Sequence, residues 1–411
     1  MYLYNYQQEA LNRTKDQERV AYFLAMGLGK TFVAGEKLKQ LNNNINLVIC
    51  QKTKIDDWVE HLNIYYNDSY NIYNLRKDSH NFLLDKRKKI GVINYDMLAR
   101  SDYLKELKDI LIVLDESAYI KNPTAKRTKA VFRLSINQCI LLSGTPVNGK
   151  YEELYTQLKL IGYAPSKDYF IKRYCLYYVN NTNGFPLKII YDYKNIDELK
   201  QVMYNLGCVL MTAEDAKLEL PEENIINISI NNTKIYKDFT KNDIAELNGK
   251  KLLGDNVFKK ILYRRKLCNN CYKLEKLQDL LNATGDRVII FYNFNDELDE
   301  IKKAIKDRPL SIVNGTKCNL DNFNNHSNAV TVIQYQAGSM GLNLQKANII
   351  IFYSLCLSSS IYEQSKARIR RLGQDKACFY YNLIVKNSIE EKIYEQLKIK
   401  KDYTEVLFKN E

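Results

Sequence analysis

Short apolar runs alternate with longer amphipathic stretches in two regions of the chain. An apolar run of this length fits a strand buried on both faces of a parallel sheet, and the amphipathic stretch after it fits a covering helix. The pattern therefore predicts two α/β lobes built from parallel βα units. The expected strands are 20–25, 46–51, 89–95, 109–116 and 138–144 in the first region, and 287–293, 310–315, 329–335, 348–354 and 378–385 in the second.

The chain from about residue 150 to 280 follows a different pattern, with longer helical periods and few buried-strand runs. We expect a helical insertion there, followed by the start of the second lobe. At 411 residues the chain is also too long for one ordinary hydrophobic core. The predicted fold class is α/β, with two doubly wound parallel-sheet lobes and a helical insertion between them. The expected divisions are 1–160 for the first lobe, 161–225 for the insertion or linker, and 226–411 for the second lobe.

The charge balance favours a polyanionic partner. There are 61 Lys and Arg residues against 48 Asp and Glu, which gives a formal charge of +13. Nucleic acid is the simplest such partner, and an anionic membrane surface is the alternative. The longest apolar run, 348–357, is about half of what a helix needs to cross a bilayer, and the N-terminus lacks a signal-peptide pattern. We therefore expect a cytoplasmic protein without a membrane partner.

Histidine and cysteine usage argues against several kinds of catalytic and metal chemistry. The three histidines, His61, His80 and His326, are far apart in the sequence, which disfavours serine–histidine, cysteine–histidine and histidine–metal sites. Among nine cysteines only Cys268 and Cys271 form a C-x-x-C pair. A four-thiolate zinc site needs a second pair, so reduced cytosolic thiols are the better interpretation.

The stretch "FLAMGLGKTFVAGEKL" at 23–38 resembles a phosphate-binding loop that lacks its first glycine, because Leu24 stands at that position. An apolar strand precedes it and a plausible helix follows, which is the context that a phosphate site at a helix N-terminus requires. Gly27 and Gly29 supply a flexible backbone, Lys30 would bind the β and γ phosphates, and Thr31 would ligate Mg²⁺. The alternative is a chance turn.

An acidic pair strengthens the nucleotide interpretation. The apolar strand in "ILIVLDES" ends in Asp115 and Glu116. Carboxylates at the carboxyl end of a strand lie in the ligand crevice of an open α/β sheet. There Asp115 could hold Mg²⁺ and Glu116 could orient or deprotonate a water molecule. Alone, such a pair could equally be a solvated strand end.

A basic segment near the end of the chain supplies a third element. On a helix through "YEQSKARIRRLGQ" (362–374), Gln364, Arg368 and Arg371 would fall on one face. Arginines that a second lobe presents to phosphates act as arginine fingers, which neutralise charge on the transferring phosphoryl group. The alternative is a basic helix that faces solvent or DNA.

Taken in order, these stretches resemble a superfamily-two helicase ATPase, and more narrowly the SWI/SNF-related DNA translocases, in a minimal phage or bacterial form. That branch does not require the distant first glycine of the loop. The resemblance also covers the acidic and Ser-Gly-Thr-Pro motifs and extends over most of the chain. The segments that carry it are "YNYQQEALNR", "AMGLGKT", "LVICQKTKIDDWVEHL", "LDESAYIKN", "LLSGTPVNG", "QAGSMGLNLQKAN" and "QSKARIRRLGQ".

The resemblance implies two RecA-like lobes that hold ATP and Mg²⁺ in the cleft between them and drive movement along double-stranded DNA. It assigns catalysis to Glu116, Arg368 and Arg371, and adenine recognition to Gln7. Lys52, Lys121 and Asn122 are candidates for contacts with DNA phosphates, with solvated surface positions as the alternative. The implied ATP and magnesium ligands are Gln7, Gly27, Gly29, Lys30, Thr31, Asp115, Gly341 and Gln364, of which Thr31 and Asp115 bind the metal.

The chain departs from the family pattern at Ala118, Ser339 and Ala367. None of these positions supplies a phosphate or magnesium ligand, so the expectation of ATP turnover stands, whereas nucleosome remodelling does not follow. Two other functions share the motifs: an RNA-dependent or single-strand-dependent helicase, and a nucleotide-gated clamp that binds DNA without sustained turnover. We expect a monomer, and any targeting would come from a protein partner or from the insertion.

Overall fold

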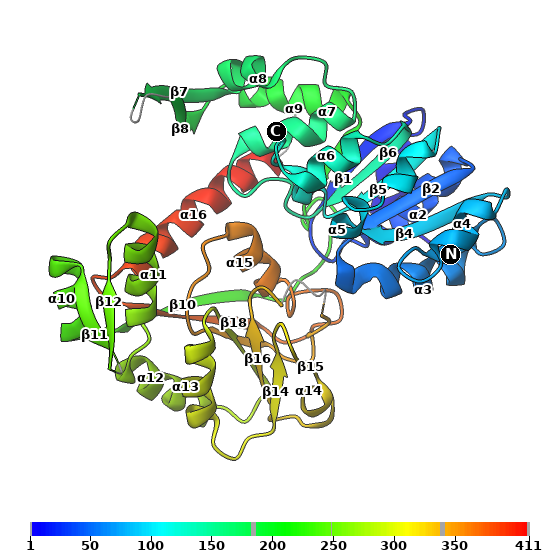
Figure 1. The fold of residues 1–411 in the computed structure, drawn as a ribbon. Helices are drawn as coiled ribbons and strands as arrows, with labels where there is room; N and C mark the ends of the chain where they lie inside the picture. The colour runs from blue at the N-terminus through cyan, green and yellow to red at the C-terminus, as the bar shows by residue number, and fades with distance from the viewer. Residues whose placement is uncertain (1, 182–185, 248, 338–341, 409–411) are drawn as a thin grey trace. The chain divides into compact units, whose positions relative to one another are not determined.

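The computed structural model describes residues 2–181, 186–247, 249–337 and 342–408. The chain divides into two compact units, one running to Leu218 and including the chain from Asp402 onward, the other spanning Glu219–Lys401. Within the described ranges each unit contains one seven-stranded sheet (Figure 1). The prediction of two α/β lobes is therefore confirmed. Segment 161–225, expected as an insertion or linker, is divided between the two units.

The sheet of the first unit has the strand order β3-β4-β2-β5-β6-β1-β9, and its neighbouring strands run parallel. In the central strand β5, Ile112 and Leu114 face one hydrophobic core while Leu111 and Val113 face the other. Burial on both faces explains the nearly continuous apolar runs of the sequence. The strands are β1 (Arg19–Leu24), β2 (Ile45–Cys50), β3 (Asn71–Asn74), β4 (Lys89–Asn94), β5 (Ile110–Asp115), β6 (Ile136–Ser143) and β9 (Cys208–Met211).

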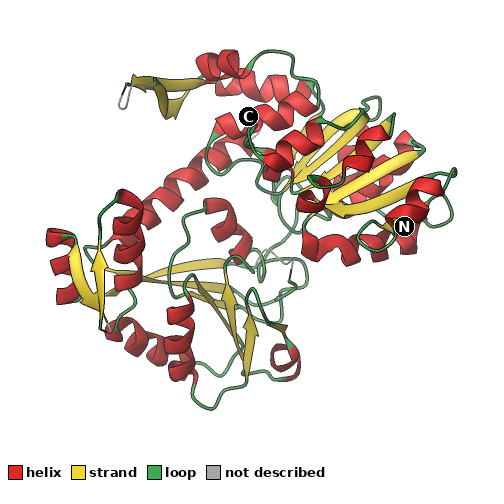
Figure 2. Cartoon of the chain, in the orientation of Figure 1, coloured by secondary structure: helices red, strands yellow, loops and turns green. Residues whose placement is uncertain are grey.

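Helices lie beside these strands (Figure 2). The helix α2 begins directly after the glycine-rich loop, and α3 follows the short helical turn η1 (Lys52–Lys54). These two connections place the residues of the candidate site. The helices are α1 (Asn5–Arg13), α2 (Lys30–Leu41), α3 (Ile55–Tyr66), α4 (Ser79–Leu84), α5 (Tyr95–Leu98), α6 (Lys126–Phe132), α7 (Leu154–Leu160), α8 (Lys167–Tyr174) and α9 (Ile196–Asn205), with short turns η2 (Asp102–Glu106), η3 (Ser117–Ile120) and η4 (Tyr151–Glu153).

The predicted helical insertion also contains β structure. Between α8 and α9, β7 (Cys175–Asn180) and β8 (Leu187–Tyr193) pair as an antiparallel hairpin. After α9 the chain returns to the first sheet, where β9 pairs with β1. The insertion is therefore a mixed helix and hairpin segment that leaves the first sheet and comes back to it.

The sheet of the second unit has the order β10-β18-β17-β13-β16-β14-β15, and its pairs are parallel apart from β14 with β15. Sequence periodicity missed the edge strand β10 because this strand is mostly half-buried or exposed. The strands are β10 (Glu223–Ile230), β13 (Val288–Tyr292), β14 (Leu310–Val313), β15 (Cys318–Asn319), β16 (Val330–Gln334), β17 (Ile349–Phe352) and β18 (Cys378–Val385), with a separate hairpin of β11 (Ile244–Leu247) and β12 (Lys250–Leu253). The helices are α10 (Lys234–Asn242), α11 (Val257–Leu267), α12 (Cys271–Asn282), α13 (Asn295–Ile305), α14 (Asp321–Asn325), α15 (Ser359–Lys366) and α16 (Ile389–Phe408).

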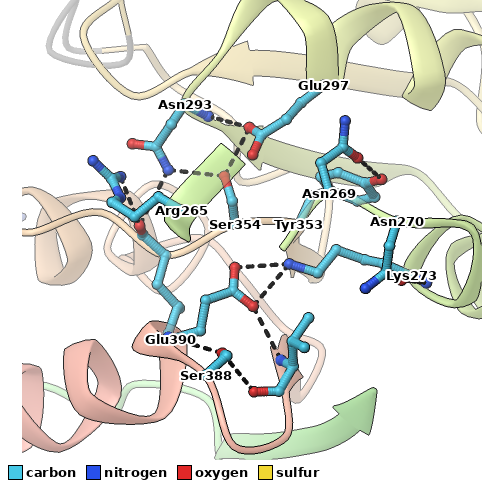
Figure 3. Close-up of polar contacts among 12 residues, drawn as sticks. Arg265, Asn269, Asn270, Lys273, Asn293, Glu297, Tyr353, Ser354, Ser388 and Glu390 are labelled. Carbon is cyan, nitrogen blue, oxygen red and sulfur yellow. Dashed lines mark hydrogen bonds and ion pairs between the residues drawn. The ribbon is translucent and has the colours of Figure 1, made fainter. Parts of the chain in front are cut away.

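A buried polar network joins the start of α16 to the second sheet (Figure 3). The Nζ of Lys273 donates to both carboxylate oxygens of Glu390, at 2.7 and 2.9 Å, and both side chains are at most 3% exposed. Glu390 also accepts the backbone N–H of Val385 at 3.0 Å. In the same region Glu297 accepts a hydrogen bond from the hydroxyl of Ser354 at 2.8 Å. Each buried charge thus has polar partners, as burial requires.

The substitution Lys273→Met should lower the free energy of unfolding by about 3 kcal/mol, because it leaves the Glu390 carboxylate buried without its cation. Urea unfolding of the full chain measures the change. Lys276→Met on the same helix is the control, since Lys276 forms an exposed pair with Asp279 at 3.4 Å and should cost less than about 1 kcal/mol. Equal losses in the two variants would contradict this account of the network.

Candidate active site

The glycine-rich loop connects β1 to α2 with a backbone that only glycine adopts easily. Gly27 has φ of 85° and Gly29 has φ of 68°, both in the left-handed region. A Cβ atom added at Gly29 would lie 2.4 Å from the side-chain nitrogen of Gln7. Both the conformation and the close approach therefore require glycine at position 29, as a phosphate-binding loop at a helix N-terminus would.

Gln7 links the start of α1 to this loop through hydrogen bonds. Its Nε2 donates to the carbonyl oxygen of Leu28 at 3.1 Å, and its Oε1 accepts the backbone N–H of Tyr4 at 3.0 Å. The side chain is 3% exposed. Adenine recognition by Gln7 stays a prediction, and the structure adds a loop-holding role that the sequence analysis did not foresee.

Lys30, the first residue of α2, folds back over the end of β1. Its Nζ donates to the carbonyl oxygens of Leu24 and Ala25, at 3.0 and 3.3 Å. A Cβ atom at Gly144 would come within 3.2 Å of the same Nζ and 3.0 Å of Met26. Gly144 directly follows β6, so the predicted Ser-Gly-Thr-Pro segment leaves room for the lysine. The motif alone did not assign Gly144 to the site.

Asp115 and Glu116 lie at the carboxyl end of β5, as predicted. In the sheet order only β6 separates β5 from β1, so the acidic pair and the phosphate loop share one edge of one sheet. Glu116 has φ of 55° and ψ of 60°, a left-handed conformation that is uncommon for glutamate and recurs at functional sites. The hydroxyl of Tyr95 donates to the carbonyl oxygen of Asp115 at 2.9 Å and so supports this turn.

The Asp115 carboxylate is desolvated and receives a hydrogen bond from an indole group. The Nε1 of Trp58 donates to its Oδ2 at 2.9 Å. Burial raises the pKa of Asp115 above its usual value, while the Trp58 N–H and the Lys30 ammonium oppose that rise. Trp58 is 3% exposed and is the only tryptophan of the chain. In the sequence Trp58 is part of a motif, with no signal there for a role at the site.

The donors at this edge fit a magnesium ion that is bound together with a nucleotide. Mg²⁺ prefers oxygen ligands and is usually held by one or two carboxylates plus substrate phosphates. Thr31 in the first turn of α2 and Asp115 offer a hydroxyl and a carboxylate. Within the described residues no three His, Cys, Asp or Glu side chains gather as a metal-binding group. Of the C-x-x-C pair, Cys268 is buried and Cys271 is exposed.

The predicted helix face of Gln364, Arg368 and Arg371 is wrong. The helix α15 ends at Lys366, so Gln364 lies on it while both arginines lie in the turn that follows. The carbonyl oxygen of Arg368 accepts the backbone N–H of Leu344 at 3.3 Å, which draws the chain out of the helical hydrogen-bond pattern. The helix therefore ends before both arginines, and a tertiary hydrogen bond to Arg368 lies just beyond its end.

The arginine turn is attached to the loop that follows β16. The Nη1 of Arg371 donates to Oδ1 of Asn343 at 3.3 Å. The amide of Gln374 donates to the carbonyl oxygens of Gln345 and Ala347 at 2.9 and 2.7 Å. Burial lowers the pKa of the Arg371 guanidinium, as expected for a desolvated cation beside a neutral amide. Gly341, predicted at the ATP site, lies outside the described residues.

The three residues predicted to contact DNA phosphates have different surroundings. Lys52 is exposed in η1. Lys121 forms an ion pair with Glu153 at 2.9 Å. Asn122 accepts hydrogen bonds from the backbone N–H and hydroxyl of Thr124, at 3.0 and 2.8 Å, which shapes a local turn. Lys121 and Asn122 thus have local structural partners, and the DNA contacts of all three residues stay predictions.

Comparison with known proteins identifies the family to which this chain belongs. A family model described as the SNF2-related domain matches residues 6–273, and one described as the helicase conserved C-terminal domain matches residues 272–373. The first match covers more than half of the chain. The chain belongs to the SNF2-related family, and the predicted resemblance to SWI/SNF-related helicases is confirmed.

The relatives are longer proteins. A Mycoplasma pneumoniae protein described as an uncharacterized ATP-dependent helicase is 24% identical over 95% of this chain and 41% of its own length. The Caenorhabditis elegans homolog of SWI/SNF-related matrix-associated actin-dependent regulator of chromatin subfamily A-like protein 1 is 24% identical over 97% of this chain and 61% of its own. A Bacillus subtilis putative ATP-dependent helicase/translocase is 26% identical over 73% of this chain and 36% of its own. The chain spans roughly half of such relatives.

Among solved structures, the SWI2/SNF2 ATPase core of Sulfolobus solfataricus in complex with double-stranded DNA aligns over 99% of this chain and 93% of its own. The TM-score is 0.47 and the sequence identity is 21%.

The helices of the described ranges all fall short of the length and apolarity that a membrane span requires.

An aromatic cluster beside the site predicts a pH dependence of stability. His61 packs against Phe32 and Tyr65, with ring centroids 4.9 and 5.0 Å away, and burial lowers its pKa from 6.5 to about 4. Between these values the unfolded chain binds a proton that the folded chain excludes, so stability should fall as the pH drops from about 6.5 toward 4. Urea unfolding across this range should show a flatter profile for His61→Phe. The control His80→Asn changes an exposed position and should keep the wild-type dependence of stability on pH. If His61→Phe kept that dependence too, its assignment to His61 would be wrong.

Proposed function

We propose that this chain is an ATP-driven motor that moves along double-stranded DNA. The observation that carries the proposal is the meeting of Lys30, the glycine-rich loop and the Asp115–Glu116 pair at one edge of the first sheet. The net charge of +13 supports a polyanionic track. The relatives described as ATP-dependent helicases and as a helicase/translocase support the same activity.

Each residue at the edge would have a distinct task. The loop N–H groups and Lys30 would bind the β and γ phosphates, exchanging the carbonyl contacts of the lysine for phosphate oxygens. Thr31 and Asp115 would hold Mg²⁺, whose chemistry is to neutralise charge on phosphate oxygens. Glu116 would accept the proton of the attacking water. Gln7 would keep the loop in place and read the adenine.

The second unit would complete the site with its arginine turn. Arg368 and Arg371 would neutralise charge on the transferring phosphoryl group, so hydrolysis would require closure of the two units on ATP. Gln364 would contribute to the same surface, and a role for Gly341 in binding ATP stays a prediction from the sequence. Lys52, Lys121 and Asn122 would grip the DNA backbone, which carries no sequence information. We expect a cytoplasmic monomer, with targeting supplied by a partner protein or by the insertion.

Glu116→Gln should keep ATP affinity and abolish turnover, because it removes the base and leaves the phosphate ligands in place. Lys30→Ala should instead weaken ATP binding. Steady-state ATPase assays and equilibrium binding of labelled ATP separate the two effects. Glu60→Gln, the same chemical change at an exposed position on α3, is the control. Equal ATPase rates in the wild type and Glu116→Gln would refute the base assignment.

The polymer specificity is tested with the wild-type chain. We expect duplex DNA to stimulate ATP hydrolysis more than single-stranded DNA or RNA of equal length. Stimulation by single strands or RNA alone would support the strand-dependent helicase instead. ATP-dependent DNA binding with little hydrolysis under all conditions would support the clamp.

Arg371→Ala should lower the rate of hydrolysis by about 10³-fold or more, with ATP affinity changed by less than about threefold, because an arginine finger acts chiefly on the transition state. Single-turnover hydrolysis and nucleotide binding measure the two quantities. Arg370→Ala is the matched control, since the neighbouring Arg370 donates to the carbonyl oxygen of Pro221 at 2.8 Å. An unchanged rate in Arg371→Ala would rule out the finger.

A further inference from the structure

One partly buried hydrogen bond at the candidate site has no place in the mechanism described so far. The indole Nε1 of Trp58 donates to Oδ2 of Asp115 at 2.9 Å, across 57 positions of the chain. Trp58 lies on α3, one turn after the helix begins, and is 3% exposed. An indole has one N–H donor and no acceptor, so this bond uses its whole hydrogen-bonding capacity.

We propose that Trp58 is a positioning residue for the magnesium-binding carboxylate of Asp115. The inference rests on the proposed ATPase function. The indole holds one oxygen of Asp115 in a fixed place, so the carboxylate would meet the cation, or a water molecule bound to it, in a single orientation. A carboxylate that is already oriented loses less rotational freedom when the cation binds.

The rest of the helix explains why the indole itself stays in position. The imidazole of His61 lies edge-on to the Trp58 ring at a centroid distance of 6.1 Å, and His61 also contacts Phe32 of α2. Phe32 directly follows Thr31, the other proposed magnesium ligand. The same aromatic cluster therefore supports the segments that carry both metal ligands.

The test uses two variants of helix α3 in the full chain. Trp58→Phe keeps an aromatic ring in the core and removes the N–H donor. Tyr66→Phe is the matched control, because it removes a buried donor from the same helix whose partner is Glu36, at 3.1 Å, instead of Asp115. A role confined to folding should give the two variants similar magnesium responses.

The first measurement is the affinity for a fluorescent ADP analogue at increasing Mg²⁺ concentrations and in excess EDTA. Trp58→Phe should need about tenfold more Mg²⁺ to reach half of the magnesium-dependent increase in affinity for the ADP analogue. Removing a group that supports a metal ligand usually weakens metal binding by at least this factor. Its affinity in EDTA should match the wild type, and Tyr66→Phe should match the wild type in both. The Mg²⁺ concentration for half-maximal ATPase should shift by the same factor, with the rate at saturating Mg²⁺ changed less than about threefold. An unshifted magnesium response in folded Trp58→Phe would overturn the proposal.

A second measurement uses only the wild-type protein, so the proposal can be tested even if Trp58→Phe fails to fold. Because Trp58 is the single tryptophan and donates to Asp115, its emission reports on the surroundings of that carboxylate. Adding Mg²⁺ to the protein with saturating ADP should change this emission with the same midpoint as the tightening of nucleotide binding. Constant emission would overturn the proposal and leave the ATPase intact. Absence of nucleotide binding in the wild type would overturn the proposed function together with it.

Discussion

The close approach of Lys30 to the end of β1 and to Gly144, just after β6, is the contact around which the first unit's candidate site is arranged. The ammonium lies within hydrogen-bonding distance of Leu24 and Ala25, in space that a side chain at Gly144 would crowd. The loop before it needs glycine at position 29 for both its φ angle and the nearby Gln7 amide. The Lys30 ammonium fits at the end of these strands because glycine, which has no side chain, stands at position 144.

Much of this arrangement is predictable from the sequence because it depends on local patterns. The strands that flank the site are apolar runs buried on both faces, and the glycines and the acidic pair follow those runs directly. Elements without a strong local signal were missed. The edge strand β10 is largely half-buried or exposed, and the hairpin β7–β8 lies within a segment of helical periodicity.

The arginine turn shows where local reasoning fails for a physical reason. A helix through Arg371 satisfies the periodicity, yet the carbonyl oxygen of Arg368 accepts from Leu344 and α15 stops at Lys366. The amide of Gln374 adds two bonds to the same loop. The arginines and the loop after β16 therefore form one hydrogen-bonded structure, so a displacement of that loop would carry the arginines with it.

The environment of Asp115 follows from strand order, which no local pattern encodes. The strands β2 and β5 are neighbours in the sheet, so the helix that follows β2 lies beside the carboxyl end of β5 and brings Trp58 to Asp115. A carboxylate in this desolvated place would be costly as an anion without a donor, because burial favours its neutral form. The indole N–H and the Lys30 ammonium both favour the ionised form. The same low-dielectric surroundings that make the carboxylate costly also strengthen its attraction for a cation. The hydrogen bond that fixes Asp115 comes from a neutral donor, so this bond orients the carboxylate without competing for the charge that a metal ion would use.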